Sequence, residues 1–140
     1  MNYYATMKSL LGKTILGLKV SEDASTLHFD TDKGHVTYLT DGDCCSETWF
    51  ADITGVSALL GGTVVDVEEV ENMTAYNVND GRGRQEEDQA YGWKIKTNKG
   101  YADIVYRNSI NGYYGGSLVG VVINEAKIAT LKPIIDDWSS

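Results

Sequence analysis

The feature that most constrains the fold of this chain is the alternation of apolar and polar residues in short segments separated by turn-forming residues. Residues 25–40, "STLHFDTDKGHVTYLT", show it clearly: Leu27 and Phe29 face one way, "DTDKG" forms a turn, and Val36 and Tyr38 return on the same side. Alternation with a period of two is typical of a β-strand that is buried on one face. The segment therefore predicts a β-hairpin.

The same alternation predicts further strands along the chain. They are expected over residues 14–20, 63–71, 91–97, 101–110 and 113–123. Leu16, Leu18 and Val20 share one face of the first of these strands, and Val65 and Val67 share one face of the second. The turn "NKG" joins the third and fourth strands into another hairpin.

One segment has a different period. In residues 43–62, apolar side chains recur at steps of three and four, which is typical of one face of a helix. These side chains are Trp49, Ile53, Val56 and Leu60. Ser46 is a suitable N-cap, and the glycine pair at 61–62 is a suitable end. The whole pattern predicts an α+β fold, with a mainly antiparallel β-sheet of about six or seven strands and one main α-helix.

Composition and charge limit the partners. The chain has 140 residues, which is enough for one domain, residues 1–140, with its own core. Its net charge of −8 argues against DNA or RNA polymers, because their binding depends on neutralising phosphates. No apolar run is long enough to span a membrane, and the first residues lack the pattern of a signal peptide. We therefore expect a cytoplasmic domain without membrane partners.

Side chains that support catalysis or metal binding are present without the spacing that these functions require. Cys44 and Cys45 are adjacent and are expected to be reduced thiols. His28 and His35 do not form a recognisable zinc spacing. Residues 77–89 predict an exposed, mobile loop, which does not fit a calcium-binding pattern. We expect no metal, no cofactor and no enzymatic activity, since no pair of acid and base or of nucleophile and base stands out.

The strand over residues 101–110 has two unlike faces. Period two places Tyr101, Asp103, Val105 and Arg107 on one face. Ile104 and Tyr106 occupy the other face, which we expect to point toward the core.

Residues 106–116, "YRNSINGYYGG", combine a turn signal with an unusual mixture of polar and aromatic groups. Asn111-Gly112 predicts a two-residue hairpin turn. In that register, the glycine pair at 115–116 lies opposite Asn108 and Arg107, and this leaves space for a ligand or a second backbone. Arginine offers a forked donor to phosphate, and tyrosine offers a stacking surface to a base. A hairpin whose glycines only relieve crowding explains the same residues equally well.

Two segments carry a resemblance to a known family, "GDCCSETWF" and "YRNSINGYYGG", within a match that covers roughly residues 10–122. The chain resembles the phage-encoded Thoeris anti-defence sponges of the first type described. The resemblance implies a non-enzymatic protein that sequesters glycocyclic ADP-ribose, a signal made by bacterial TIR-domain enzymes, in the host cytoplasm. It also implies assembly into a dimer or a higher homo-oligomer such as a hexamer. Some members bind cyclic trinucleotides as well, and the resemblance leaves this open here.

The resemblance also suggests which residues bind the signal. It implies that Tyr101 stacks on adenine, that Arg107 contacts the pyrophosphate and that Asn111 contacts ribose or base. It further makes three residues supporting candidates, and these are Asn108, Tyr113 and Tyr114. His28, on the strand face opposite Leu27 and Phe29, becomes a candidate contact from a partner subunit. The "CCSETWF" segment is assigned to packing.

Two other functions are open at this point. One is an enzyme that degrades the same signal, which requires a nucleophile or base near Arg107. The other is an acidic inhibitor that blocks a host defence factor through its charge of −8. Binding by such an inhibitor would weaken steeply as salt rises, because salt screens exposed charges.

Overall fold

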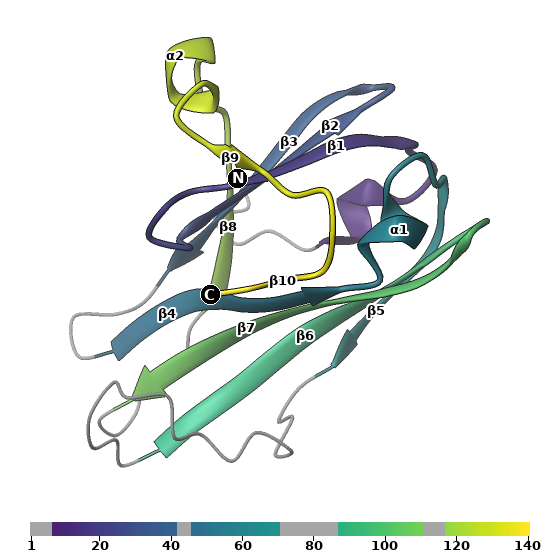
Figure 1. Ribbon diagram of the computed structural model, residues 1–140. Helices are drawn as coiled ribbons and strands as arrows, with labels where there is room; N and C mark the ends of the chain where they lie inside the picture. The colour runs from purple at the N-terminus through teal and green to yellow at the C-terminus, as the bar shows by residue number, and fades with distance from the viewer. Residues whose placement is uncertain (1–6, 42–45, 71–86, 111–116) are drawn as a thin grey trace.

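The computed structural model describes residues 7–41, 46–70, 87–110 and 117–140 of the chain. They form two five-stranded antiparallel sheets that lie one above the other (Figure 1). The large hydrophobic cluster draws its side chains from both sheets, so the core lies between them. The fold is therefore rich in antiparallel β-structure, as the alternating sequence pattern predicts.

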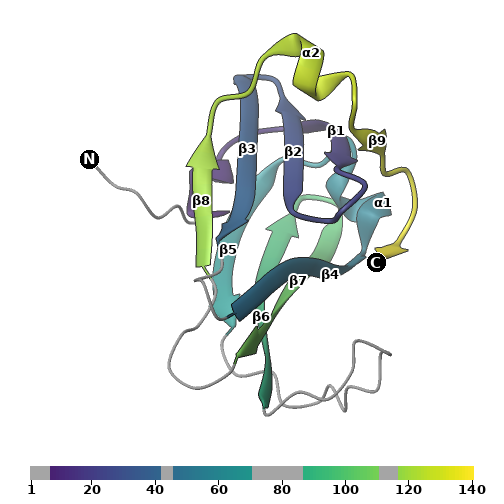
Figure 2. The same cartoon turned by 90° about the vertical axis from the view of Figure 1, so that its left-hand side faces the viewer.

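The first sheet contains the N-terminal strands. Its order is β8-β3-β2-β1-β9. The bounds are Ile15–Val20 for β1, Thr26–Thr31 for β2, Gly34–Asp41 for β3, Ser117–Val121 for β8 and Lys132–Pro133 for β9. Figure 2 shows β8, β3, β2 and β1 side by side in this order.

The second sheet has the order β10-β4-β7-β6-β5. Its strands are β4 (Ser46–Thr54), β5 (Val64–Val70), β6 (Glu87–Thr97), β7 (Gly100–Ile110) and β10 (Trp138–Ser139). The long β6–β7 hairpin runs through the middle of this sheet, and β4 covers the other edge of β7. Both edges of β7 are therefore occupied.

Helices in the described part of the chain are short. They are the 3-10 helix η1 (Met7–Leu10), α1 (Val56–Leu59) and α2 (Glu125–Ile128). None of them is long and apolar enough to cross a membrane. Side chains of η1 and α1 join the core, whereas α2 buries none of its residues and protrudes beyond the first sheet (Figure 1).

The two hairpins predicted from alternation are confirmed. In β2–β3, Leu27 lies opposite Tyr38 and Phe29 opposite Val36, and the rings of Phe29 and Tyr38 meet edge to face at 5.9 Å. In β6–β7, Thr97 lies opposite Gly100 across the predicted turn.

The main helix predicted over residues 43–62 is wrong. Residues 46–54 form strand β4, and only Val56–Leu59 are helical. A β-bulge between Phe50 and Asp52 shifts the alternation, and Trp49 is buried on the outer face while Phe50 and Ile53 are buried in the core. Because β4 has buried apolar side chains on both faces and a bulge between them, these side chains recur in the sequence at steps of three and four, as they would in a helix. With ten strands described, the predicted count of six or seven is also too low.

The prediction that Leu16 shares a face with Leu18, and Val65 with Val67, is wrong for the same reason. Leu16 is 63% exposed because a bulge between Ile15 and Gly17 moves Ile15 into the core instead. Val65 is exposed beside a second bulge between Val64 and Asp66. A bulge adds one residue to a strand and reverses the faces that simple alternation assigns.

Strands β7 and β8 do not pair as the hairpin predicted at Asn111-Gly112 requires, and the two turn residues lie outside the described residues. β8 pairs with β3 in the first sheet, whereas β7 pairs with β4 and β6 in the second. Arg107 lies opposite Trp49 and Ala90, so the predicted register with the glycine pair is wrong. The turn signal favours pairing of β7 with β8, but β4 and β6 already occupy both edges of β7, so no edge is left for β8.

Of the loop predicted over residues 77–89, positions 77–86 lie outside the described residues, and positions 87–89 begin β6. Cys44 and Cys45 also lie outside them.

Candidate functional site

The outer face of β7 carries the residues that the sequence singles out. Ile104 and Tyr106 are buried in the core, which confirms the predicted inward face. Tyr101 is 56% exposed on the opposite face, and Arg107 follows it on that face near the other end of the strand. The predicted division of the strand into two faces is correct.

Tyr101 is an exposed aromatic ring with two cations beside it. Lys96 lies directly opposite it on β6, and Lys94 is two residues away on the same face. Their Nζ atoms lie 5.7 and 5.5 Å from the centre of the ring. Neither lysine forms an ion pair within the described residues. The arrangement presents a flat aromatic surface with two ammonium groups beside it, on a face that also carries the carboxylates of Asp66, Glu68 and Asp103.

Arg107 is in a different environment. The residue is only 7% exposed, and its guanidinium carbon lies 5.2 Å from the centre of the Trp49 ring. Trp49 belongs to a small outer cluster with Ala24, Ala51 and Val105, against which Trp138 packs. Arg107 is therefore held against an aromatic surface on the outer side of the second sheet.

The structure does not bring all of the predicted ligand contacts together. Tyr101 and Arg107 are six residues apart on one strand, or about 20 Å at about 3.3 Å per residue. Asn108 follows Arg107 in β7, with Thr48 and Gln89 opposite it. Asn111 lies outside the described residues, as do Tyr113 and Tyr114. The roles of these residues stay predictions.

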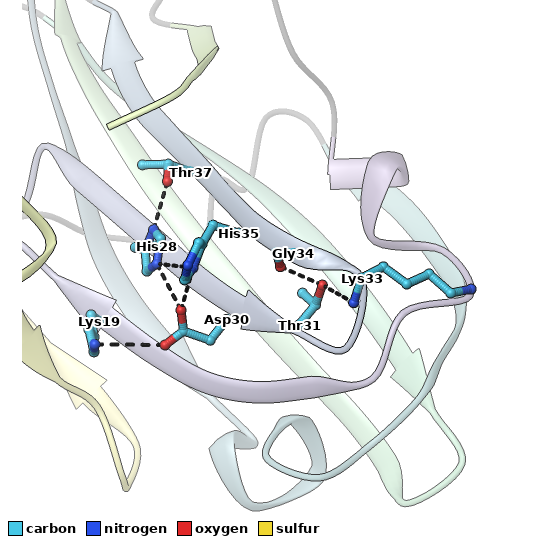
Figure 3. A network of polar contacts seen from close by, with 8 residues as sticks. All are labelled: Lys19, His28, Asp30, Thr31, Lys33, Gly34, His35 and Thr37. Carbon is cyan, nitrogen blue, oxygen red and sulfur yellow. Dashed lines mark hydrogen bonds and ion pairs between the residues drawn. The ribbon is translucent and has the colours of Figure 1, made fainter. Parts of the chain in front are cut away.

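A polar cluster that the sequence did not predict lies on the outer face of the first sheet (Figure 3). Asp30 Oδ1 accepts hydrogen bonds from His28 Nε2 at 3.0 Å and from His35 Nδ1 at 2.6 Å. The two histidine nitrogens are 3.1 Å apart. Thr37 Oγ1 lies 2.7 Å from His28 Nδ1, and Lys19 Nζ lies 3.7 Å from Asp30 Oδ2. We refer to His28, Asp30 and His35 as the histidine–aspartate cluster.

Burial differs sharply across this cluster. The His28 side chain is fully buried, Asp30 is partly exposed, and His35 is 61% exposed. His28 lies on the predicted strand face, opposite Leu27 and Phe29, which are in the core. Its predicted contact with a partner's ligand stays a prediction, and in this structure its ring contacts its own sheet.

The protonation of the cluster follows from these surroundings. Burial lowers the pKa of His28, and the hydrogen bond to Asp30 opposes this only in part. Burial by itself would raise the pKa of Asp30, but hydrogen bonds from His28 and His35 outweigh it and lower the pKa overall. A neutral imidazole at His28 and an ionised carboxylate at Asp30 are therefore favoured near neutral pH.

Strand pairing explains why spacing along the sequence missed this cluster. His28 lies opposite Thr37 and Asp30 opposite His35 in the β2–β3 hairpin. Side chains two residues apart on a strand share a face, so all four groups meet on one side. The hairpin register was available from the sequence, but a search for known metal-binding spacings does not use it.

Comparison with known proteins adds one finding. A family model described as "Domain of unknown function (DUF7448)" matches residues 8–120. A search of curated proteins found no match. A search of solved structures found none either.

Proposed function

We propose that this chain, which belongs to the DUF7448 family of domains of unknown function, binds a nucleotide-like signal and sequesters it without degrading it. The single observation that carries this proposal is the exposed ring of Tyr101 between Lys94 and Lys96. A soluble domain gains nothing in core stability from an aromatic ring held open to solvent on a sheet face. Such a ring is suited to a ligand that has its own flat surface.

The chemistry of the face fits a base joined to phosphates. Stacking on an aromatic side chain contributes about 1–3 kcal/mol per base. The ammonium groups of Lys94 and Lys96 lie close enough to the ring to reach the phosphates of a ligand stacked on it. The same face also carries Asp66 and Glu68, which lie opposite Lys96 and Lys94 on β5, and Asp103, which lies opposite Lys94 on β7. The two lysines are therefore individual contacts for an anion and do not form a broad positive surface, which favours a small ligand over a polymer.

Arg107 cannot serve the same ligand as Tyr101 within one chain, because the two lie too far apart along β7. In a homo-oligomer, Arg107 of one subunit and Tyr101 of another can face a shared pocket. We therefore place the signal-binding pocket at a subunit boundary, in a dimer or a larger ring such as a hexamer.

The identity of the signal in this proposal comes from the family resemblance of the sequence. Its expected ligand is glycocyclic ADP-ribose, which combines an adenine base with a pyrophosphate. Sequestration would take place in the cytoplasm of a phage-infected bacterium and would keep the Thoeris effector inactive. Cyclic trinucleotides are a second ligand class to test on the same protein.

The proposal is tested by titrating the purified protein with glycocyclic ADP-ribose in a calorimeter. Tyr101→Ala should weaken binding about 10- to 100-fold, as loss of stacking requires, while Tyr101→Phe should retain it. Lys96→Gln should weaken binding several-fold, and Lys132→Gln, an exposed lysine on the first sheet, is the matched control. Heat denaturation of the complex should release intact ligand.

Three results contradict the proposal. Recovery of a cleaved product would identify an enzyme that degrades the signal. Wild-type affinity in Tyr101→Ala would show that the binding face lies elsewhere. If the protein binds no nucleotide but captures a host protein in a strongly salt-dependent way, it is an acidic inhibitor instead.

A further inference from the structure

The histidine–aspartate cluster has the geometry of a metal-binding site. His28 Nε2, Asp30 Oδ1 and His35 Nδ1 converge, with separations of 3.0, 2.6 and 3.1 Å. We propose that these three atoms bind one divalent transition-metal ion, with Zn²⁺ as the expected occupant. Nothing in this proposal depends on the nucleotide-binding function.

The distances leave room for an ion with little movement. Zinc lies about 2.0–2.2 Å from nitrogen and oxygen ligands, so two ligands of a tetrahedral ion are about 3.3 Å apart. Two of the observed separations, 3.0 and 3.1 Å, are within a few tenths of an ångström of this value, and the third, 2.6 Å between His35 and Asp30, is about 0.7 Å shorter. The exposed His35 side chain can move by this amount. An ion at bonding distance from all three atoms lies roughly 1 Å above their plane. All three ligands then lie on one side of the ion.

The scaffold beneath the cluster holds these ligands in place. All of them project from the β2–β3 hairpin, whose register is continuous from Thr26 to Thr31. The turn is tied by a hydrogen bond from Thr31 Oγ1 to the Gly34 carbonyl at 2.6 Å (Figure 3). Ligands on a rigid hairpin lose little conformational entropy when an ion binds.

Thr37 acts as the supporting partner that metal-ligating histidines usually have. Because an ionised Asp30 carboxylate can only accept, the neutral His28 ring donates from Nε2, and its Nδ1 then accepts from the Thr37 hydroxyl. When Nε2 binds an ion, the ring proton must sit on Nδ1, and the same hydroxyl can accept it. Thr37 therefore satisfies both tautomers of a ring that is fully buried.

The donor set selects the class of ion. Two imidazole nitrogens and one carboxylate suit zinc and neighbouring transition metals, whereas Ca²⁺ and Mg²⁺ prefer oxygen ligands alone. Three protein ligands on one side leave at least one position for water or another ligand, which is characteristic of reactive rather than purely structural sites. The exposed edge at His35 gives access to that position.

Lys19 opposes the ion, and this gives the proposal a distinctive test. Its Nζ lies 3.7 Å from Asp30 Oδ2, so its positive charge repels a bound cation. Lys19→Gln should therefore strengthen metal binding by roughly three- to tenfold. A purely structural hydrogen-bond network has no reason to gain metal affinity from this change.

The experiment measures Zn²⁺ binding to tag-free protein by calorimetry, with Co²⁺ absorption as a spectroscopic readout of coordination. All variants carry Cys44→Ser and Cys45→Ser, which removes thiolates as competing ligands. One ion should bind per chain. His35→Ala and Asp30→Asn should each weaken binding by at least about 100-fold, since even supporting partners are worth about 10- to 100-fold. Thr37→Val should weaken it about 10- to 100-fold.

Asp32→Asn is the matched control, because Asp32 lies on the same hairpin but outside the cluster and accepts a hydrogen bond from the Thr14 amide. Its zinc affinity should equal that of the parent. Unfolding curves of each variant establish that it is folded, and removal of the exposed His35 ring should disturb folding least.

The proposal is overturned if the parent binds no Zn²⁺ or Co²⁺. It is also overturned if His35→Ala and Asp30→Asn bind as tightly as Asp32→Asn, or if Ca²⁺ or Mg²⁺ competes equally with zinc.

Discussion

Gly55 determines how closely α1 can approach β7, and its replacement tests the fold beneath Tyr101. Gly55 has φ of 75°, in the left-handed region, and directly precedes α1. A Cβ at this position would collide with the backbone of Tyr101 and Ala102. Since β7 is paired on both edges, that backbone cannot retreat easily.

The expected cost of Gly55→Ala is the sum of a conformational term and a steric term. A left-handed conformation costs an alanine about 1–2 kcal/mol, and reduced freedom of the unfolded chain returns about 0.4–1 kcal/mol. The collision adds about 1–3 kcal/mol, as overpacking does in other cores. The free energy of unfolding should therefore fall by about 2–4 kcal/mol.

Gly12→Ala separates the two terms. Gly12 has nearly the same φ, 79°, but a Cβ there would meet no atom within 4 Å. This variant should lose only about 1 kcal/mol. Urea unfolding of the two variants and the parent measures the difference. If Gly55→Ala is no less stable than Gly12→Ala, the close contact between the start of α1 and β7 is absent, and the position assigned to Tyr101 is wrong with it.

Two further changes test the buried polar groups of both sheets. Burial raises the pKa of Tyr38 to about 12, although a hydrogen bond with Ser9 lowers it. The buried neutral phenol of Tyr38 therefore stabilises the folded state fully below about pH 10, the pKa in the unfolded chain. As pH rises from 10 toward 12, the free energy of unfolding falls by about 3 kcal/mol. Unfolding between pH 8 and 11 should thus be less pH-dependent in Tyr38→Phe, and equal dependence would contradict the burial of the phenol. Arg107→Ala should lower the free energy of unfolding by about 1–2 kcal/mol through loss of its contact with Trp49, and should abolish signal binding. Normal binding in a folded Arg107→Ala protein would place the pocket elsewhere.

The sequence predicted the positions of some candidate residues and not of others, and the reason differs from residue to residue. Period two correctly placed Tyr101 outside and Tyr106 inside, because side chains alternate on any extended strand. It could not show that Arg107 is held against Trp49, because that contact joins strands more than fifty residues apart in the chain. Lys94 and Lys96 were overlooked as partners of Tyr101, although the predicted hairpin implied their position.

What the sequence by itself determined was local: the strands, and the hairpins closed by "DTDKG" and "NKG". Their alternation and their turns lie within about twenty residues, so short-range physics is sufficient to specify them. Only the tertiary structure decided that residues 46–54 form a strand, because burial on both faces and a bulge hid its period. It also decided that β8 leaves β7 and joins β3, since β4 already occupies the edge of β7 that the Asn111-Gly112 turn would need. The histidine–aspartate cluster stands between these cases: its hairpin was predictable, but the convergence of its three side chains became visible only in the paired strands.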